Sequence, residues 1–335
     1  MEPIHILLLR PDSDDPAAVD QSLGARLAAT HAPQCAEATI VEASFHHRDL
    51  GDLEKALRQQ RGAVSAVVGA TGVPESTRLG ELADTMGLLC FVANNNPVVW
   101  QHRRHVFHIG LPSSQTAAAV AAQLQRLGCK RIALVHDRTE FQRRVAASME
   151  SAMQSRGAAV QQFEALTDAT REGLSAFHPE LVYVVFSSEE KALPVARAVR
   201  ALGIGVPLLF GRSLMRRTFL DRLEAASGEL WFVDMFSRLA PRDAAMQRFF
   251  GSLEQAGVSV PTANHAFGWD GMSFCAQALR AAGGAVDHAL DYLQSGVEIG
   301  GVTGSCRFSR DNHNGRSGSG PTVITRWRDR RFEDV

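Results

Sequence analysis

Short apolar runs alternate along the chain with longer amphipathic stretches. The runs, each of strand length, cover residues 5–9, 38–43, 66–70, 88–93, 131–136, 159–164, 181–186, 207–211 and 230–236. Stretches with helical periodicity lie between them, and several end in glycine, as helices commonly do. Strand, helix, strand at this spacing predicts an α/β fold with parallel sheets and right-handed crossovers.

The alternation breaks in two places. An extended piece at residues 106–111 precedes Pro112 and a new helical stretch, and the run at residues 230–236 is followed by Pro241 and Asp243 before another. A chain of 335 residues is too long for one ordinary core and suits two lobes of roughly 150 residues. We therefore interpret both breaks as crossovers between two lobes.

Charge and hydropathy exclude several classes of partner. Lys and Arg number 35 against 36 Asp and Glu, which gives no electrostatic reason to expect nucleic acid or an anionic membrane. No run approaches the roughly 18 apolar residues of a membrane helix, so we expect no membrane insertion. The first residues lack the pattern of a cleavable signal peptide. This leaves two expectations open: a periplasmic protein whose signal has been removed, and a cytoplasmic one.

Residues with metal-binding or catalytic chemistry form no recognisable set. The five cysteines are scattered without a CxxC pair, and Cys90, Cys129 and Cys275 lie in apolar surroundings that favour buried, unreactive thiols. His102 and His108 stand either side of His105 at intervals of three, without a cysteine or carboxylate to complete a metal site. GxSxG, P-loop and GxGxxG motifs are absent. We expect neither an enzyme nor a cofactor.

The order of several short motifs resembles a known family. The motifs are GARLA, AVVGATGVPEST, the NNNP turn, FHIGLPSSQTAAAVAAQL, GCKRIALVHDRTEFQRRVA, ARAVRALGI, GWDGMSFCAQALRAAGG and GVTGSCRFSRDNHNGR. Together they resemble the type I periplasmic solute-binding proteins of the Leu/Ile/Val-binding kind, which serve branched-chain amino acid ABC transporters. The resemblance spans nearly the whole chain.

The resemblance implies two Rossmann-like lobes joined by three crossover strands, with a small-molecule ligand between them and hinge closure. We expect residues 1–111 and 240–304 to form the first lobe, and residues 112–239 and 305–335 the second. It further implies a monomer that docks on a membrane permease and performs no chemistry. A cytoplasmic sensor of the same fold, controlling a regulatory partner, is the alternative.

In the first lobe, the resemblance points to two turns as ligand contacts. The first carries Thr71, Gly72 and Val73, with Val73 where amino-acid binders usually have a serine. The second holds Asn94, Asn95 and Asn96, whose amides suit neutral polar groups. A plain turn at the end of a buried strand is the alternative role for these asparagines.

In the second lobe, Phe141 matches an aromatic contact, and Ser187 and Ser188 follow a strand, where they either touch the ligand or cap the next helix.

The position of the acid that holds an amino acid's ammonium falls on Ser213, beside Arg212. Arg212 suits an anion or is a solvated loop residue. Trp269 is interpreted either as a cleft wall or as core. A buried ammonium without a counter-charge is costly, so we expect an aromatic or aliphatic acid, an amide or a larger apolar ligand in place of a zwitterionic amino acid.

Overall fold

The computed structural model describes residues 3–164, 167–223, 228–236, 243–316 and 322–335. It divides the chain into two compact units, of residues 1–111 with 242–317 and of residues 112–241 with 318–335. The chain therefore passes between the units three times. Pro241, at the second passage, lies outside the described residues, whereas Asp243 caps the helix that follows by accepting from the backbone N–H groups of Ala245 and Met246, each at 2.9 Å.

The last boundary differs from the sequence-based one, which assigned residues 305–335 to the second lobe. Strand β12 (Gly304–Ser309) pairs antiparallel with β11 (Ser295–Gly301), and Arg316 donates to the carbonyl of Ile109 at 3.0 Å. These contacts hold residues 305–316 in the first unit. The sequence shows a turn at residues 302–304 but not which strand the following residues pair with.

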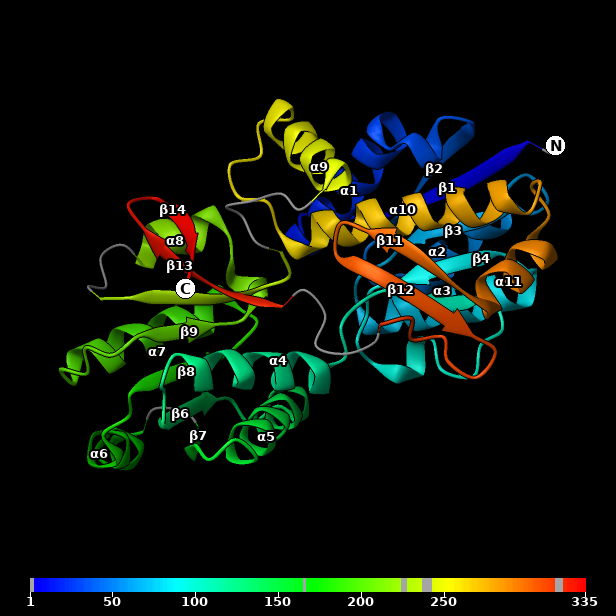
Figure 1. The fold of residues 1–335 in the computed structure, drawn as a ribbon. Coiled ribbons are helices and arrows are strands. Elements are labelled where there is room, and N and C mark those ends of the chain that lie inside the picture. Colours follow the sequence, from blue (N-terminus) through cyan, green and yellow to red (C-terminus); the bar gives the residue numbers. More distant parts are fainter. Residues whose placement is uncertain (1–2, 165–166, 224–227, 237–242, 317–321) are drawn as a thin grey trace. The chain divides into compact units, whose positions relative to one another are not determined.

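The first unit is built on a parallel sheet of order β2-β1-β3-β4-β5, seen in cyan and blue in Figure 1. Its strands are β1 (Ile4–Asp12), β2 (Ala38–His46), β3 (Ala66–Gly69), β4 (Leu89–Val92) and β5 (Val106–His108). Its helices are α1 (Pro16–His31), η1 (Pro33–Cys35), α2 (Leu50–Arg58), α3 (Val73–Met86), η2 (Pro97–Val99), α9 (Ala244–Gln255), α10 (Ala263–Ala281) and α11 (Val286–Gln294).

Both faces of this sheet are buried, which explains why its central strands are continuous apolar runs. Alternate residues such as Leu7 and Leu9 pack with α2 and α3, whereas α10 packs on the other face, where Gly271 approaches Val68 and Phe91. The carboxyl ends of the five strands consequently share one edge, which is where open α/β sheets place ligand-binding loops.

Helices α1 and α10 approach each other closely at two glycines. A Cβ atom on Gly24 would overlap the backbone of His265, and one on Gly268 would overlap the backbone of Gln21. The two motifs that contain these glycines, GARLA and GWDGM, are therefore helix-packing motifs. They place the amino-terminal half of α10 in the core of the first unit.

The second unit contains a sheet of order β14-β13-β10-β9-β8-β6-β7. Its strands are β6 (Arg131–His136), β7 (Ala159–Glu164), β8 (Leu181–Val185), β9 (Leu208–Phe210), β10 (Leu230–Asp234), β13 (Val323–Arg328) and β14 (Arg331–Asp334). Its helices are α4 (Ser113–Arg126), α5 (Glu140–Gln154), α6 (Asp168–Phe177), α7 (Glu189–Ala201), η3 (Arg212–Leu214) and α8 (Arg217–Leu223). The pairs of β13 with β10 and with β14 are antiparallel, whereas the other strands pair in parallel.

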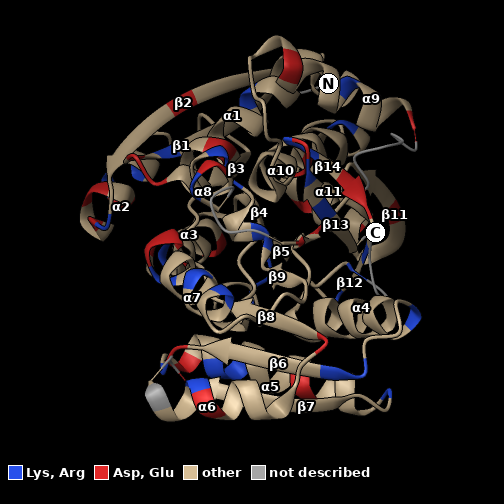
Figure 2. Cartoon of the chain, turned by 90° about the vertical axis from the view of Figure 1, so that its left-hand side faces the viewer, with Lys and Arg blue, Asp and Glu red and all other residues tan. Residues whose placement is uncertain are grey.

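Both faces of this sheet also pack against helices. Side chains of β6 and β8 such as Leu134 and Tyr183 pack with α4 and α5, whereas Phe210 on β9 packs against Phe219 of α8 with ring centroids 5.3 Å apart. Positively and negatively charged residues are interspersed along the helices of both units (Figure 2), in keeping with the net charge of −1.

Candidate functional site

The turn after β4 is built from the three asparagines and is held to the turn after β3. Asn94 donates from Nδ2 to the carbonyl of Thr71 at 3.0 Å and accepts at Oδ1 from the backbone N–H of Asn96, also at 3.0 Å. Asn95 Oδ1 lies 3.3 Å from His108 Nε2, and Asn96 caps η2 by accepting from Val98 N at 3.3 Å. The structure thus joins Thr71 to Asn94. Each asparagine makes turn-stabilising bonds while remaining half-buried at the carboxyl edge of the sheet.

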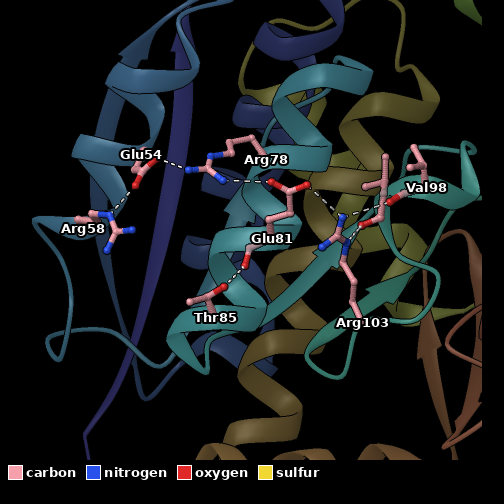
Figure 3. A network of polar contacts seen from close by, with 8 residues as sticks. Glu54, Arg58, Arg78, Glu81, Thr85, Val98 and Arg103 are labelled. Carbon is pink, nitrogen blue, oxygen red and sulfur yellow. Dashed lines mark hydrogen bonds and ion pairs between the residues drawn. The ribbon is translucent and has the colours of Figure 1, made fainter.

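A chain of charged side chains connects the segment after this turn to helices α3 and α2 (Figure 3). Arg103 donates to the carbonyl of Val99 at 3.0 Å and lies 3.6 Å from Glu81, which pairs in turn with Arg78 at 3.1 Å. Arg78 continues the chain to Glu54 on α2. Because α3 carries both Arg78 and Glu81, the segment that follows the asparagines is anchored to the helix that follows Thr71.

The turn after β3 leads directly into α3. Gly72 is the N-cap residue and Val73 begins the helix, with no side-chain cap. Ala70 adopts a positive φ of 55°, a conformation that is uncommon for residues other than glycine. Val73, at the position of the missing serine, is 40 % exposed. At its first residue, helix α3 therefore offers backbone N–H donors but no side-chain hydroxyl.

A residue that sequence reasoning missed lies beside this helix end. Glu75, in the first turn of α3, is 3 % exposed, and its carboxylate makes no hydrogen bond within the described residues. His47 Nδ1 lies 3.4 Å from Glu75 Oε1, and it too has no hydrogen-bond partner among those residues. In the sequence, Glu75 is a glutamate at the third position of a helix, where its ordinary role is in a capping box. This pattern gives no sign that its side chain is buried.

Glu75 lines an open pocket of about 590 Å³ at the carboxyl ends of β1, β2 and β3. The wall also contains Asp15, His47, Arg48, Leu50, Gly72 and Pro74. All of these residues belong to the first unit, and Gly72 is the predicted site residue among them. Pockets for small ligands commonly have volumes of about 300–1,000 Å³.

The same unit has a second described pocket of about 790 Å³, lined by Trp100, Arg103, Arg104, His313 and neighbouring residues of α11. None of the residues predicted as ligand contacts lines it.

In the second unit, three predicted residues lie in the segments that directly follow β6 and β8. Phe141, in the first turn of α5, is 50 % exposed. When the side-chain amide of Gln142 is oriented so that both of its ends are hydrogen-bonded, it donates to the carbonyl of Val185 at 2.7 Å and accepts from the backbone N–H of Ser187 at 3.3 Å. Ser188 holds the N-cap position of α7, but its hydroxyl donates to Glu190 at 2.6 Å and makes no capping bond.

Arg212 and Ser213 lie in η3, directly after β9. Burial lowers the pKa of the Arg212 guanidinium, and the nearby Tyr183 and Asp234 oppose this shift. Asp234 is fully buried at the end of the neighbouring strand β10, and it is an acid that sequence reasoning did not pair with Arg212. The interpretation of Arg212 as a solvated loop residue is therefore wrong, since it lies half-buried beside an acid of its own unit.

Of the two interpretations of Trp269, cleft wall and core residue, its surroundings match the core residue. It is 3 % exposed on α10 and packs against Phe249 of α9, with ring centroids 5.5 Å apart. The prediction of Trp269 as a ligand contact is therefore withdrawn.

The cysteines are free thiols, and burial raises the pKa of Cys35, Cys90 and Cys306 to about 12. Cys90 and Cys275 are buried as expected, whereas Cys129 is only partly buried. Among the described residues, no group of three or more His, Cys, Asp or Glu is arranged to hold a metal ion.

Comparison with known proteins shows the class to which this architecture belongs. The family described as "Periplasmic binding protein" matches residues 53–331, so the chain belongs to it. This confirms the resemblance seen in the sequence and the two-lobed α/β fold. Among curated proteins, no sequence matches the chain significantly.

Solved structures share the fold over almost the whole chain. A leucine-binding protein LivK from Thermotoga maritima has a TM-score of 0.79 at 16 % identity, covering 99 % of this chain and 97 % of its own. LivJ from Streptococcus pneumoniae, in complex with isoleucine, has a TM-score of 0.77 at 18 % identity, covering 99 % and 98 %. A solute-binding protein from R. palustris, in complex with benzoate, has a TM-score of 0.75 at 16 % identity, covering 100 % and 96 %. At these identities the likeness is one of fold.

No helix in the described part of the chain is both long and apolar enough to span a membrane.

Proposed function

We propose that this protein is a periplasmic solute-binding protein that captures a small organic ligand between its two units and delivers it to the permease of an ABC transporter. Membership of the periplasmic binding protein family over residues 53–331 carries this proposal. Each unit also presents polar side chains at the carboxyl ends of its parallel strands, where α/β sheets bind ligands. The chain acts as a monomer without a cofactor and performs no chemistry on the ligand.

Ligand binding acts by hinge closure. A ligand that touches both units stabilises their closed arrangement by the difference between its affinities for the closed and open forms. The proposed contacts are Thr71, Gly72, Val73, Asn94, Asn95 and Asn96 in the first unit, and Phe141, Ser187, Ser188, Arg212 and Ser213 in the second.

The ligand is not a zwitterionic amino acid in the orientation that leucine binders use. Val73 brings no hydroxyl to the helix end that takes a carboxylate in such proteins, and Ser213 stands where the resemblance places the acid for the ammonium. The ligand is an acid, an amide or a larger apolar molecule with few polar groups. Solved structures of this fold hold leucine, isoleucine or benzoate, so the architecture accommodates different ligands.

Mass spectrometry of small molecules released from the purified protein tests the proposal directly. It is paired with thermal-shift screening of amino acids, aromatic acids, amides and lipids, because a ligand that binds the folded form raises its melting temperature. We expect a saturable rise with at least one class and none with leucine or valine. A saturable rise with leucine would contradict the exclusion of amino acids, and the absence of any captured molecule would contradict the function.

A further inference from the structure

The buried carboxylate of Glu75 is an unsatisfied acceptor in a pocket wall. It is 3 % exposed and makes no hydrogen bond within the described residues, and its neighbour His47 also has an unbonded Nδ1 at 3.4 Å. Burying a carboxylate without donors is costly, and native proteins rarely tolerate it. A group that donates to Glu75 would remove this cost, so the ligand itself is the expected partner.

Glu75 lies beside the amino-terminal end of α3. The first turn of an α-helix carries a partial positive charge that stabilises a nearby carboxylate, and Gly72, the N-cap residue, leaves the space into which this carboxylate leans. Glu75 thus stands where related folds would receive an anion. A second carboxylate, brought by a ligand, would meet like-charge repulsion there.

The remaining walls fit an organic molecule with a positive end. Leu50 and Pro74 provide apolar surface, and Asp15 adds a second acid to the lining. Arg48 is exposed on the loop after β2, so its charge is solvated, unlike that of Glu75. The buried part of the pocket therefore favours a donor over an acceptor.

We propose that this pocket receives a hydrogen-bond-donating end of the ligand, a protonated amine or amidine, and that Glu75 is its acceptor, supported by His47. The inference rests on the proposed solute-binding function but changes the ligand class given there: an amine or amidine replaces the acid, amide or apolar molecule inferred from Val73 and Ser213. It reverses the polarity of the helix-end subsite, which would otherwise take a carboxylate.

A ligand series that keeps one apolar body and changes its polar end provides the test. Isoamylamine, isovaleramide and isovalerate share a branched alkyl chain, and leucine adds both charges. We expect the amine to bind the wild-type protein most tightly in isothermal titration calorimetry, with the amide weaker and the acid undetected. Tighter binding of isovalerate than of isoamylamine would overturn the proposal in favour of an anion site at Arg48.

The variant Glu75→Gln separates a ligand acceptor from a structural carboxylate. It should weaken amine binding about tenfold or more, because a charge-assisted hydrogen bond is lost. Without ligand it should melt about 2–4 °C higher than the wild type, because the buried charge is removed. The control Glu37→Gln removes an exposed carboxylate of the same unit and should change neither value. A lower melting temperature of Glu75→Gln, or unchanged amine affinity, would make Glu75 a structural residue.

The molecule released from the native protein decides the case in which no member of the series binds. An amine or amidine in the released ligand supports the proposal, whereas a ligand with a carboxylate and no donor overturns it while leaving solute binding intact. Failure to capture any small molecule would instead overturn the solute-binding function, and the inference with it.

Discussion

Two buried carboxylates in the first unit have opposite surroundings. Asp270, on α10, is fully buried and accepts from the backbone N–H groups of Val302 and Thr303 at 2.7 and 2.9 Å and from the hydroxyl of Thr303. Arg316 lies 3.8 Å from it and bonds the same hydroxyl. Glu75, almost equally buried, accepts no hydrogen bond within the described residues.

The difference distinguishes a structural acid from one available to a ligand. Each oxygen of Asp270 is used to hold the turn between β11 and β12 against α10, and Gly301 leaves room for it because a Cβ there would lie 2.6 Å from the carboxylate. Buried polar groups that are fully bonded make one structure more specific, whereas an unbonded group is a cost that folding alone does not explain. Asp270 therefore belongs to the fold, and Glu75 to a site.

The largest expected effect is that of Asp270→Asn. The amide presents an N–H₂ group to backbone donors and removes the negative charge beside the buried Arg316, so we expect a loss of about 3–5 kcal/mol in the free energy of unfolding. Urea denaturation followed by circular dichroism measures this loss. A change below about 1 kcal/mol would mean that Asp270 and Glu75 do not differ in structural role.

The packing that carries Asp270 into the core is tested by Gly268→Ala. Alanine is the better helix former, but its Cβ would overlap the backbone of Gln21, so we expect a loss of about 1–3 kcal/mol despite the gain in propensity. Gly251, in the middle of α9, has open space where a methyl group would stand, and Gly251→Ala should raise stability by up to about 1 kcal/mol. Equal effects of the two changes in the same denaturation experiment would exclude close packing of α1 and α10 as the cause.

The asparagine turn is an intermediate case, in which side chains are bonded yet half-buried. Asn94→Ala removes two hydrogen bonds, to Thr71 and from Asn96, and should lower stability by about 1 kcal/mol. We expect a larger loss in affinity for the released ligand, measured by titration calorimetry. Unchanged affinity would leave Asn94 a turn former only.

The smallest expected effect concerns pH and a buried imidazole. Burial lowers the pKa of His313, whose Nδ1 donates to the carbonyl of Val106 at 2.9 Å, while Asp84 opposes and His105 reinforces the shift electrostatically. The unfolded chain binds a proton near the ordinary value of 6.5, whereas the folded protein resists it. The contribution of His313 to the free energy of unfolding is therefore fully present above that pH and is lost as the pH falls below it.

The variant His313→Gln should flatten this decline in melting temperature between about pH 7 and pH 5, relative to its own value at pH 8. Parallel curves for variant and wild type would show that another group causes the loss at acid pH.

The sequence by itself determined much of this molecule. Continuous apolar runs predicted the parallel strands of both sheets, because strands covered on two faces have no polar face to alternate, and the order of motifs identified the family. The run of asparagines after β4 predicted a turn at the carboxyl edge, since short amides bond the adjacent backbone.

Only the tertiary structure decided which polar residues are buried and with what partners. Glu75, Asp234 and Asp270 resemble ordinary helix or strand-end acids in the sequence, and Trp269 resembles an available aromatic. Their roles depend on elements far away along the chain, such as Arg316 for Asp270 and α9 for Trp269. Local patterns report hydrogen-bonding capacity and periodicity, whereas desolvation and charge pairing depend on every element that packs around a residue.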